Sequence, residues 1–143
     1  MAAFVLDASL ALAWVLKGER TSRTETLLAE TGAHGAIVTT LWPIEIANVL
    51  MLYERKKIFT SADRAKAIAT YASLPITTDD QTAARAWGKA FDLALDHKLT
   101  VYDAGYLELA LRAGLPLATL DGALCRAATA LGVPVLGYSD DDA

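Results

Sequence analysis

The chain has 143 residues, the length of one ordinary domain, and 54% of them are apolar, so it can fold around a hydrophobic core. Its formal net charge of −4 excludes a broad basic surface that holds nucleic acid without specificity. Any attraction to nucleic acid must then be local, and a bound divalent cation can supply it. We expect a single domain over residues 1–143.

Two features bear on the cellular compartment. Cys125 is the only cysteine, so no disulfide forms within the chain, and its apolar surroundings favour a small buried side chain. The N-terminal segment is apolar, but it lacks a basic region, contains Asp7 and has no clear cleavage site. No apolar run approaches the ~18 residues that span a bilayer. We expect a cytoplasmic protein with no membrane segment.

Short apolar runs alternate along the chain with longer segments of helical periodicity. In chain order we expect a strand at 4–6, helices at 9–17 and 23–30, a strand at 36–39, helices at 43–57 and from 61, a strand at 75–77, helices at 82–97 and 103–112, a strand at 115–120, a helix from 121 that Gly132 ends, and a strand at 133–136. The strands alternate little, as buried parallel strands do. This order predicts an α/β protein, a three-layer α/β/α sandwich with a central parallel sheet.

Residues with special backbone preferences mark several helix ends. Pro43 suits the first residue of its helix, and Ser61 can cap the helix that follows. Gly18 comes directly after the expected end of the first helix, and Gly32 follows the end of the second.

Four acidic residues fall where strands end or helices begin. Asp7 ends the first strand, Glu45 lies in the first turn after the second strand, Asp103 begins a helix, and Asp121 follows the strand at 115–120. In an open parallel sheet, functional residues gather beyond the carboxyl ends of the strands, so we expect the four acids on one edge. Oxygen-rich clusters suit Mg²⁺ or Mn²⁺, and two such ions can activate a water and stabilise the leaving oxygen in phosphodiester hydrolysis.

Helix capping is the competing interpretation of these acids. Asp is a preferred N-cap and acids in a first turn complement the helix dipole, so Asp103 and Asp121, taken singly, favour capping. Asp7 is the least explained in this way, because Ser9 can cap the same helix. Four carboxylates on one edge also repel one another unless a cation or protons intervene, and this favours a metal site.

Three polar residues are placed to support the acids. Ser9 can hydrogen-bond the carboxylate of Asp7, with an N-cap role as an equal alternative. Asn48 is three residues after Glu45 and shares its helix face. Thr119 lies two residues before the last acid, on the same side of its strand.

Four segments resemble the PIN-domain family, and within it the VapC-type toxins of bacterial toxin-antitoxin pairs. They are VLDAS at 5–9, PIEIANVL at 43–50, TVYDAGYLELA at 100–110 and ATLDGAL at 118–124. The resemblance covers nearly the whole chain. It implies a doubly wound sandwich with a central parallel sheet. It also implies an acid quartet that holds Mg²⁺ or Mn²⁺ and cuts single-stranded or structured RNA. In this chain the quartet is Asp7, Glu45, Asp103 and Asp121.

The resemblance also implies partners. VapC-type toxins usually form homodimers and are silenced by a small antitoxin whose C-terminal segment covers the site. Some members carry a further acid after the last Asp, but this chain has only apolar or small residues at 122–125, so we expect a second metal to be weakly held or to arrive with the substrate. The apolar first helix and three tryptophans also favour a homodimer, with core packing as the alternative; these are Trp14, Trp42 and Trp87.

Other functions fit the sequence less well. A haloacid-dehalogenase-type phosphatase wants a second Asp two residues after the first, where this chain has Ser9. A phospho-acceptor receiver domain wants a late lysine, and no lysine follows Lys98. His34 and His97 have no metal-type spacing with an acid, and we expect both on the surface near helix ends. A non-catalytic PIN-like binding module stays open as the alternative function.

Overall fold

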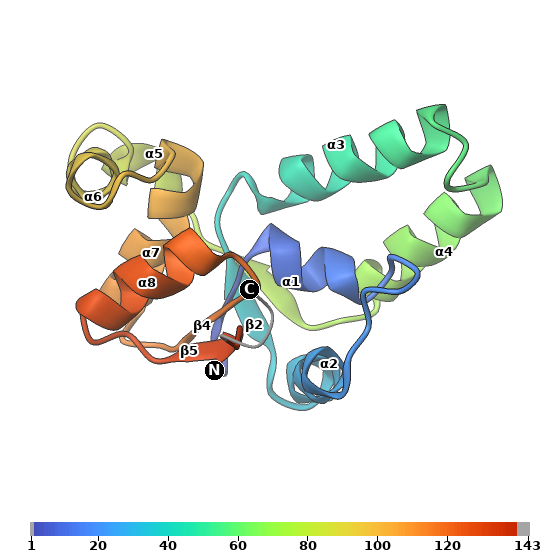
Figure 1. The fold of residues 1–143 in the computed structure, drawn as a ribbon, viewed down its shortest axis with the longest axis horizontal. Coiled ribbons are helices and arrows are strands. Elements are labelled where there is room, and N and C mark those ends of the chain that lie inside the picture. Colours follow the sequence, from blue (N-terminus) through green and yellow to red (C-terminus); the bar gives the residue numbers. More distant parts are fainter. Residues whose placement is uncertain (1, 140–143) are drawn as a thin grey trace.

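The computed structural model describes residues 2–139. These residues form one parallel sheet between two layers of helices (Figure 1). The strand order is β3-β2-β1-β4-β5, and each neighbouring pair is parallel. The chain moves outward from β1 to β3 and then crosses back to β4 and β5, so right-handed crossovers place helices on both faces. Figure 1 shows α1–α4 on one side and α5–α8 on the other. The three-layer α/β/α prediction is confirmed.

The elements follow the expected order. The strands are β1 (Val5–Leu6), β2 (Ala36–Val38), β3 (Ile76–Thr78), β4 (Leu117–Thr119) and β5 (Val135–Gly137). The helices are α1 (Ala8–Ala13), α2 (Ser22–His34), α3 (Trp42–Arg55), α4 (Ser61–Ala72), α5 (Thr82–Arg85), α6 (Lys89–His97), α7 (Val101–Ala113) and α8 (Gly122–Ala130).

Two helices have a different N-cap from the one expected. Asp7 rather than Ser9 caps α1, because the Asp7 carboxylate accepts the backbone N–H of Leu10 at 2.9 Å. Thr60 rather than Ser61 caps α4, and its hydroxyl takes part in a capping box. The expectation that capping explains Asp7 least was therefore wrong.

Other helix boundaries also differ from the sequence-based ones. Helix α1 is shorter than expected, and α2 continues through Gly32, because the buried face of α2 outweighs the low helix propensity of a single glycine. Pro43 is the second residue of α3, not the first. The expected helix at 82–97 is two helices, since Gly88 has non-helical angles (φ −112°, ψ −107°). Helix α7 is capped by Thr100, so Asp103 is its third residue and not its cap.

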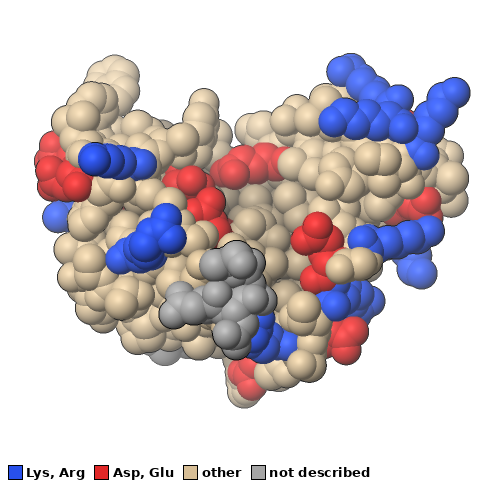
Figure 2. All heavy atoms as spheres, viewed as in Figure 1, with Lys and Arg blue, Asp and Glu red and all other residues tan. Residues whose placement is uncertain are grey.

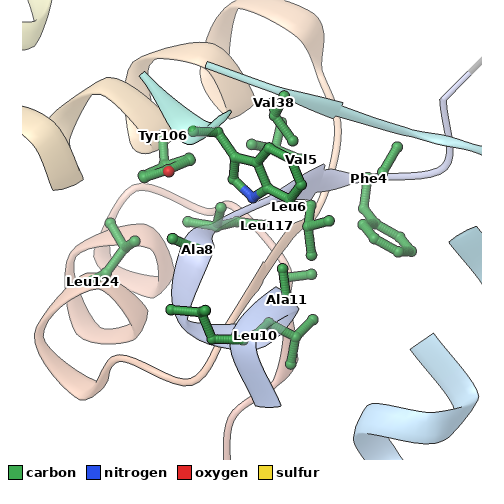
Figure 3. Packing of buried hydrophobic residues seen from close by; sticks show 14 of the residues in the cluster. Phe4, Val5, Leu6, Ala8, Leu10, Ala11, Val38, Tyr106, Leu117 and Leu124 are labelled. Carbon is green, nitrogen blue, oxygen red and sulfur yellow. The ribbon is translucent and has the colours of Figure 1, made fainter. Parts of the chain in front are cut away.

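The centre of the core is β1, which has a strand on each side. Phe4, Val5 and Leu6 are at most 1% exposed. Figure 3 shows them packed among side chains that come from α1 and from neighbouring strands, including Leu10 and Val38. Because the strands are parallel, the helices that follow them begin at the carboxyl edge of the sheet. The four acids come after strands or at the starts of helices at this edge.

The aromatic residues divide between core and surface. Trp14 and Trp42 are buried, and so is most of α1, so the expectation that the first helix and these tryptophans form an interface was wrong. Trp87 is 95% exposed between α5 and α6. Phe91 and Leu95, which follow at intervals of four residues, are also exposed.

Three further sequence-based expectations can be compared with the structure. Cys125 is half-buried in α8 rather than buried. His34 and His97 lie in the last turns of α2 and α6, as expected. Over residues 2–139, the structure contains no helix with both the length and the apolar character needed to cross a membrane.

Candidate active site

Asp7 lies at the carboxyl end of β1 and is almost fully buried, at 3% exposure. The Ser9 hydroxyl donates to its two carboxylate oxygens at 2.8 and 2.9 Å, and the backbone N–H of Leu10 donates at 2.9 Å. The Thr119 hydroxyl donates a further hydrogen bond to the same carboxylate. These donors hold the buried carboxylate in one orientation.

The same hydroxyls join the end of β1 to the end of β4. The backbone N–H of Asp121 donates to the Thr119 oxygen at 3.0 Å, and that of Leu120 donates to the Ser9 oxygen at 3.0 Å. Asp121 is the N-cap of α8, and its side chain accepts the backbone N–H of Leu124 at 2.9 Å. Ser9 and Thr119 therefore fix Asp7 relative to the turn that carries Asp121.

Glu45 reaches the site from the first turn of α3. Its side chain is half-buried and accepts a hydrogen bond from the hydroxyl of Tyr106, at 2.9 Å. Tyr106 is 1% exposed and lies on α7, three residues after Asp103. The sequence reasoning missed Tyr106, although the three-residue interval places it on the same helix face as Asp103.

Asp103 lies in the first turn of α7 and is the acid that couples the others electrostatically. Its charge raises the pKa of both Asp7 and Glu45, and the charge of Asp121 raises the pKa of Asp103 in turn. The four acids are thus close enough to influence one another, although they come from four separate parts of the chain.

Burial is the main cause of the altered acidity in the site. It raises the pKa of Asp7 from its ordinary 3.8 to about 7, against the lowering effect of the hydrogen bonds from Thr119, Leu10 and Ser9. Burial also raises the pKa of Glu45 and of Asp103. Between residues 2 and 139, no ion pair joins a Lys or Arg side chain to any of these three acids.

The chemistry of these donors fits a hard divalent cation, because carboxylate and hydroxyl oxygens are the ligands that Mg²⁺ and Mn²⁺ prefer. Within residues 2–139, no group of three or more His, Cys, Asp and Glu side chains is already arranged to hold a metal. A cation would therefore have to draw the acids closer together. Asn48 is exposed on α3, one turn after Glu45.

Acidic side chains gather around a hollow of the surface. Figure 2 shows Asp and Glu side chains gathered between the α3–α4 side of the molecule and the α5–α8 side.

Comparison with known proteins gives the family. The family model described as the PIN domain matches residues 4–130. The chain therefore belongs to the PIN-domain family. Within that family it is similar to the VapC type: it is 30% identical over 130 residues to a protein named Ribonuclease VapC3 from Pyrobaculum aerophilum, covering 91% of this chain and 98% of that protein.

A solved structure supports the fold. The crystal structure of PAE2754 from Pyrobaculum aerophilum superposes with a TM-score of 0.68 and covers 94% of this chain and 83% of that one. Its sequence is 20% identical, so the likeness shows the fold alone. The phosphatase and receiver-domain alternatives are set aside by the family.

Proposed function

We propose that this chain is a Mg²⁺- or Mn²⁺-dependent endoribonuclease and the toxin component of a toxin-antitoxin pair. Membership of the PIN-domain family and the ribonuclease name of its relative support a nuclease. The observation that carries the metal-dependent mechanism is the position of Asp103. Its charge raises the pKa of Asp7 and of Glu45, and the charge of Asp121 raises the pKa of Asp103. Such a cluster is stabilised by a cation.

The proposed metal ligands are Asp7, Glu45, Asp103 and Asp121. A bound Mg²⁺ or Mn²⁺ lowers the pKa of a water and stabilises a leaving oxygen in phosphodiester hydrolysis. Ser9 and Thr119 hold the Asp7 carboxylate, and Tyr106 holds that of Glu45, so these residues orient the proposed ligands. Asn48 is exposed near Glu45 and is assigned to contact with the RNA.

The test is cleavage of RNA by the purified protein with and without metal. We expect cleavage with Mg²⁺ or Mn²⁺ and none in EDTA. Water is the expected nucleophile, so the products should carry 5′-phosphates rather than 2′,3′-cyclic ends. Unchanged cleavage in EDTA would falsify the metal mechanism. A protein that binds RNA but never cuts it would instead be the non-catalytic binding module.

The proposed partners follow from the same assignment. We expect a homodimer, and a cognate antitoxin that inserts a basic or aromatic side chain toward the acid cluster and so blocks cleavage. We also propose a cytoplasmic location, which an RNA substrate and a single cysteine support. Addition of the antitoxin in equal amount should stop RNA cleavage, and continued cleavage in a stable complex would contradict this mode of inhibition.

A further inference from the structure

Unpaired positive charge is concentrated at one end of the α3–α4 arm, which consists of α3, residues 56–60 and α4. Arg55 is the last residue of α3, and Lys56 and Lys57 follow it; all three are exposed. Across residues 2–139, no ion pair joins any of the three to an acid, whereas nearby Arg64 is paired with Glu54. Figure 2 shows Lys and Arg side chains gathered at the far end of the arm.

Local folding does not require this charge. A single cation near a helix C-terminus complements the helix dipole, and Arg55 already lies in the last turn of α3. Lys57 has φ 59°, in the left-handed region, where glycine fits at a lower free energy. Glycine at residue 57 would therefore make the turn more stable, as it would at Lys98 after α6, which has φ 56°.

One face of α3 connects these cations to the candidate active site. Glu45 lies in the first turn, and Arg55 ends the helix ten residues later, about 15 Å away along the axis. Residues at intervals of three, four and four positions share one face of a helix. On α3 and just beyond it, this face carries Glu45, Asn48, Leu52 and Lys56. Asn48, Leu52 and Lys56 are exposed, so their side chains are able to contact a strand that lies on this face.

We propose that this face of α3 is a track for single-stranded RNA, with Lys56 and Lys57 binding backbone phosphates several nucleotides from the bond that is cut. The inference rests on the proposed nuclease function. Attraction at the far end of the arm offsets the repulsion between the phosphates and the acid cluster. Because Glu45 and Arg55 are about 15 Å apart along the helix axis, a dinucleotide is too short to reach both ends.

The test compares two double variants that each lose two positive charges. Lys56→Gln/Lys57→Gly removes the proposed phosphate contacts and also relieves the left-handed lysine, so loss of folding cannot explain weaker binding. Lys17→Gln/Arg20→Gln is the matched control, at exposed positions beyond the end of α1 that leads away from the acids. Binding of a labelled pool of random 20-nucleotide RNAs is measured by anisotropy in Ca²⁺, and gel electrophoresis checks that the RNA stays intact.

The expected result is a Kd about tenfold weaker for Lys56→Gln/Lys57→Gly and near wild type for the control. The slope of log Kd against log salt should fall by about 1.4 for two lost phosphate contacts on a single strand. Dinucleotides, which are too short to span the track, should show no difference between the two variants. Equal binding of the 20-nucleotide pool by both variants, or no binding by the wild type, overturns the RNA track. Cleavage with Mn²⁺ is measured separately. If the wild type cuts RNA but both variants bind RNA equally, the RNA track is contradicted and the nuclease function still stands.

Discussion

Asp7 is the residue in which folding and the proposed chemistry conflict most directly. Its buried carboxylate has a pKa of about 7, so near neutral pH the metal-free folded state holds a proton that the unfolded chain releases. Protonated Asp7 therefore stabilises the folded state fully below about pH 4, near the pKa of Asp7 in the unfolded chain. This stabilisation is lost as the pH rises to about 7, the pKa in the folded state. The rise in pKa corresponds to roughly 4 kcal/mol of unfolding free energy.

The variant Asp7→Asn tests this pH dependence. In EDTA, the unfolding free energy of the wild type should fall relative to Asp7→Asn between pH 4 and pH 7, as measured by urea denaturation. Asp63→Asn is an opposite control: hydrogen bonds from the Thr60 backbone and side chain lower the pKa of exposed Asp63, so its contribution is lost as pH falls. Parallel curves for the wild type and Asp7→Asn would show that Asp7 does not titrate in this range.

Asp103 is the residue whose replacement best separates a metal site from a helix cap. Thr100 caps α7, so Asp103→Asn removes one charge without removing the cap. We expect this variant to lose cleavage, to melt at least as high as the wild type in EDTA because repulsion from Asp121 is removed, and to gain less melting temperature from Mn²⁺. Asp96→Asn, at an exposed position on α6, is the control and should behave as wild type. An active Asp103→Asn enzyme with the full Mn²⁺ response would remove the site as proposed.

At the residue scale, the sequence predicts those contacts that follow from short intervals along the chain. Ser9 and Thr119 each lie two residues from an acid, and both hydrogen-bond Asp7 in the structure. The bond between Thr119 and Asp7 spans 112 positions, however, and it exists because β1 and β4 are neighbours in the sheet. Tyr106 could not be assigned to Glu45 from the sequence, because their hydrogen bond spans 61 positions and no local pattern predicts it.

Helix α7 carries a second buried group of charges besides Asp103. The Arg112 guanidinium donates to both oxygens of Asp79 at 3.0 and 2.9 Å and to Glu108 at 2.9 Å. Asp79 and Glu108 are 7% and 4% exposed. Although burial acts to raise it, the hydrogen bonds from Arg112 and Thr82 lower the pKa of Asp79. This group ties α7 to the segment between β3 and α5.

Removing Arg112 should therefore destabilise the fold strongly. We expect Arg112→Met to lower the unfolding free energy by about 3 kcal/mol, because two buried carboxylates lose their counter-charge. Replacing Asp79 with Asn and Glu108 with Gln in the same chain should restore part of the loss. The exposed pair between Arg64 and Glu54 is the comparison, and Arg64→Met should cost less than about 1 kcal/mol. Equal costs in urea denaturation would mean that burial does not distinguish the two pairs.

At the element scale, periodicity and strand composition predict the order of the elements but not their ends. The helices and strands follow one another in the predicted order, because the spacing of apolar residues reflects which face of each element is buried. The ends depend on competing caps: Thr60 and Ser61 are both able to cap α4, and only the backbone path selects Thr60. The break at Gly88 is a further case, since α5 and α6 both pack against α7 and a continuous helix would not follow that path.

Over the whole molecule, apolar and charged groups are distributed unevenly on the surface. Asp and Glu side chains surround the hollow between the two sides of the molecule, whereas Lys and Arg side chains gather at the far end of the α3–α4 arm (Figure 2). The exposed apolar side chains Trp87, Phe91 and Leu95 follow one another at four-residue intervals along one face of α6 and the turn before it. A stripe of large apolar groups of this kind on a small domain favours contact with another protein surface.

We expect this stripe to form the homodimer contact, with each copy covering the α6 stripe of the other. Light scattering at micromolar concentration should give twice the 15.2 kDa mass of the chain for the wild type and a monomer for Trp87→Ser/Leu95→Ser. Both side chains are largely exposed, at 95% and 68%, so the double variant should lose no more than about 0.5 kcal/mol of unfolding free energy beyond the stabilisation that the dimer contact provides. The matched control, Ile58→Ser/Leu131→Ser, replaces two exposed apolar residues elsewhere and should remain dimeric. A monomeric wild type would end the homodimer proposal, and a dimer that survives Trp87→Ser/Leu95→Ser would place the contact on another face.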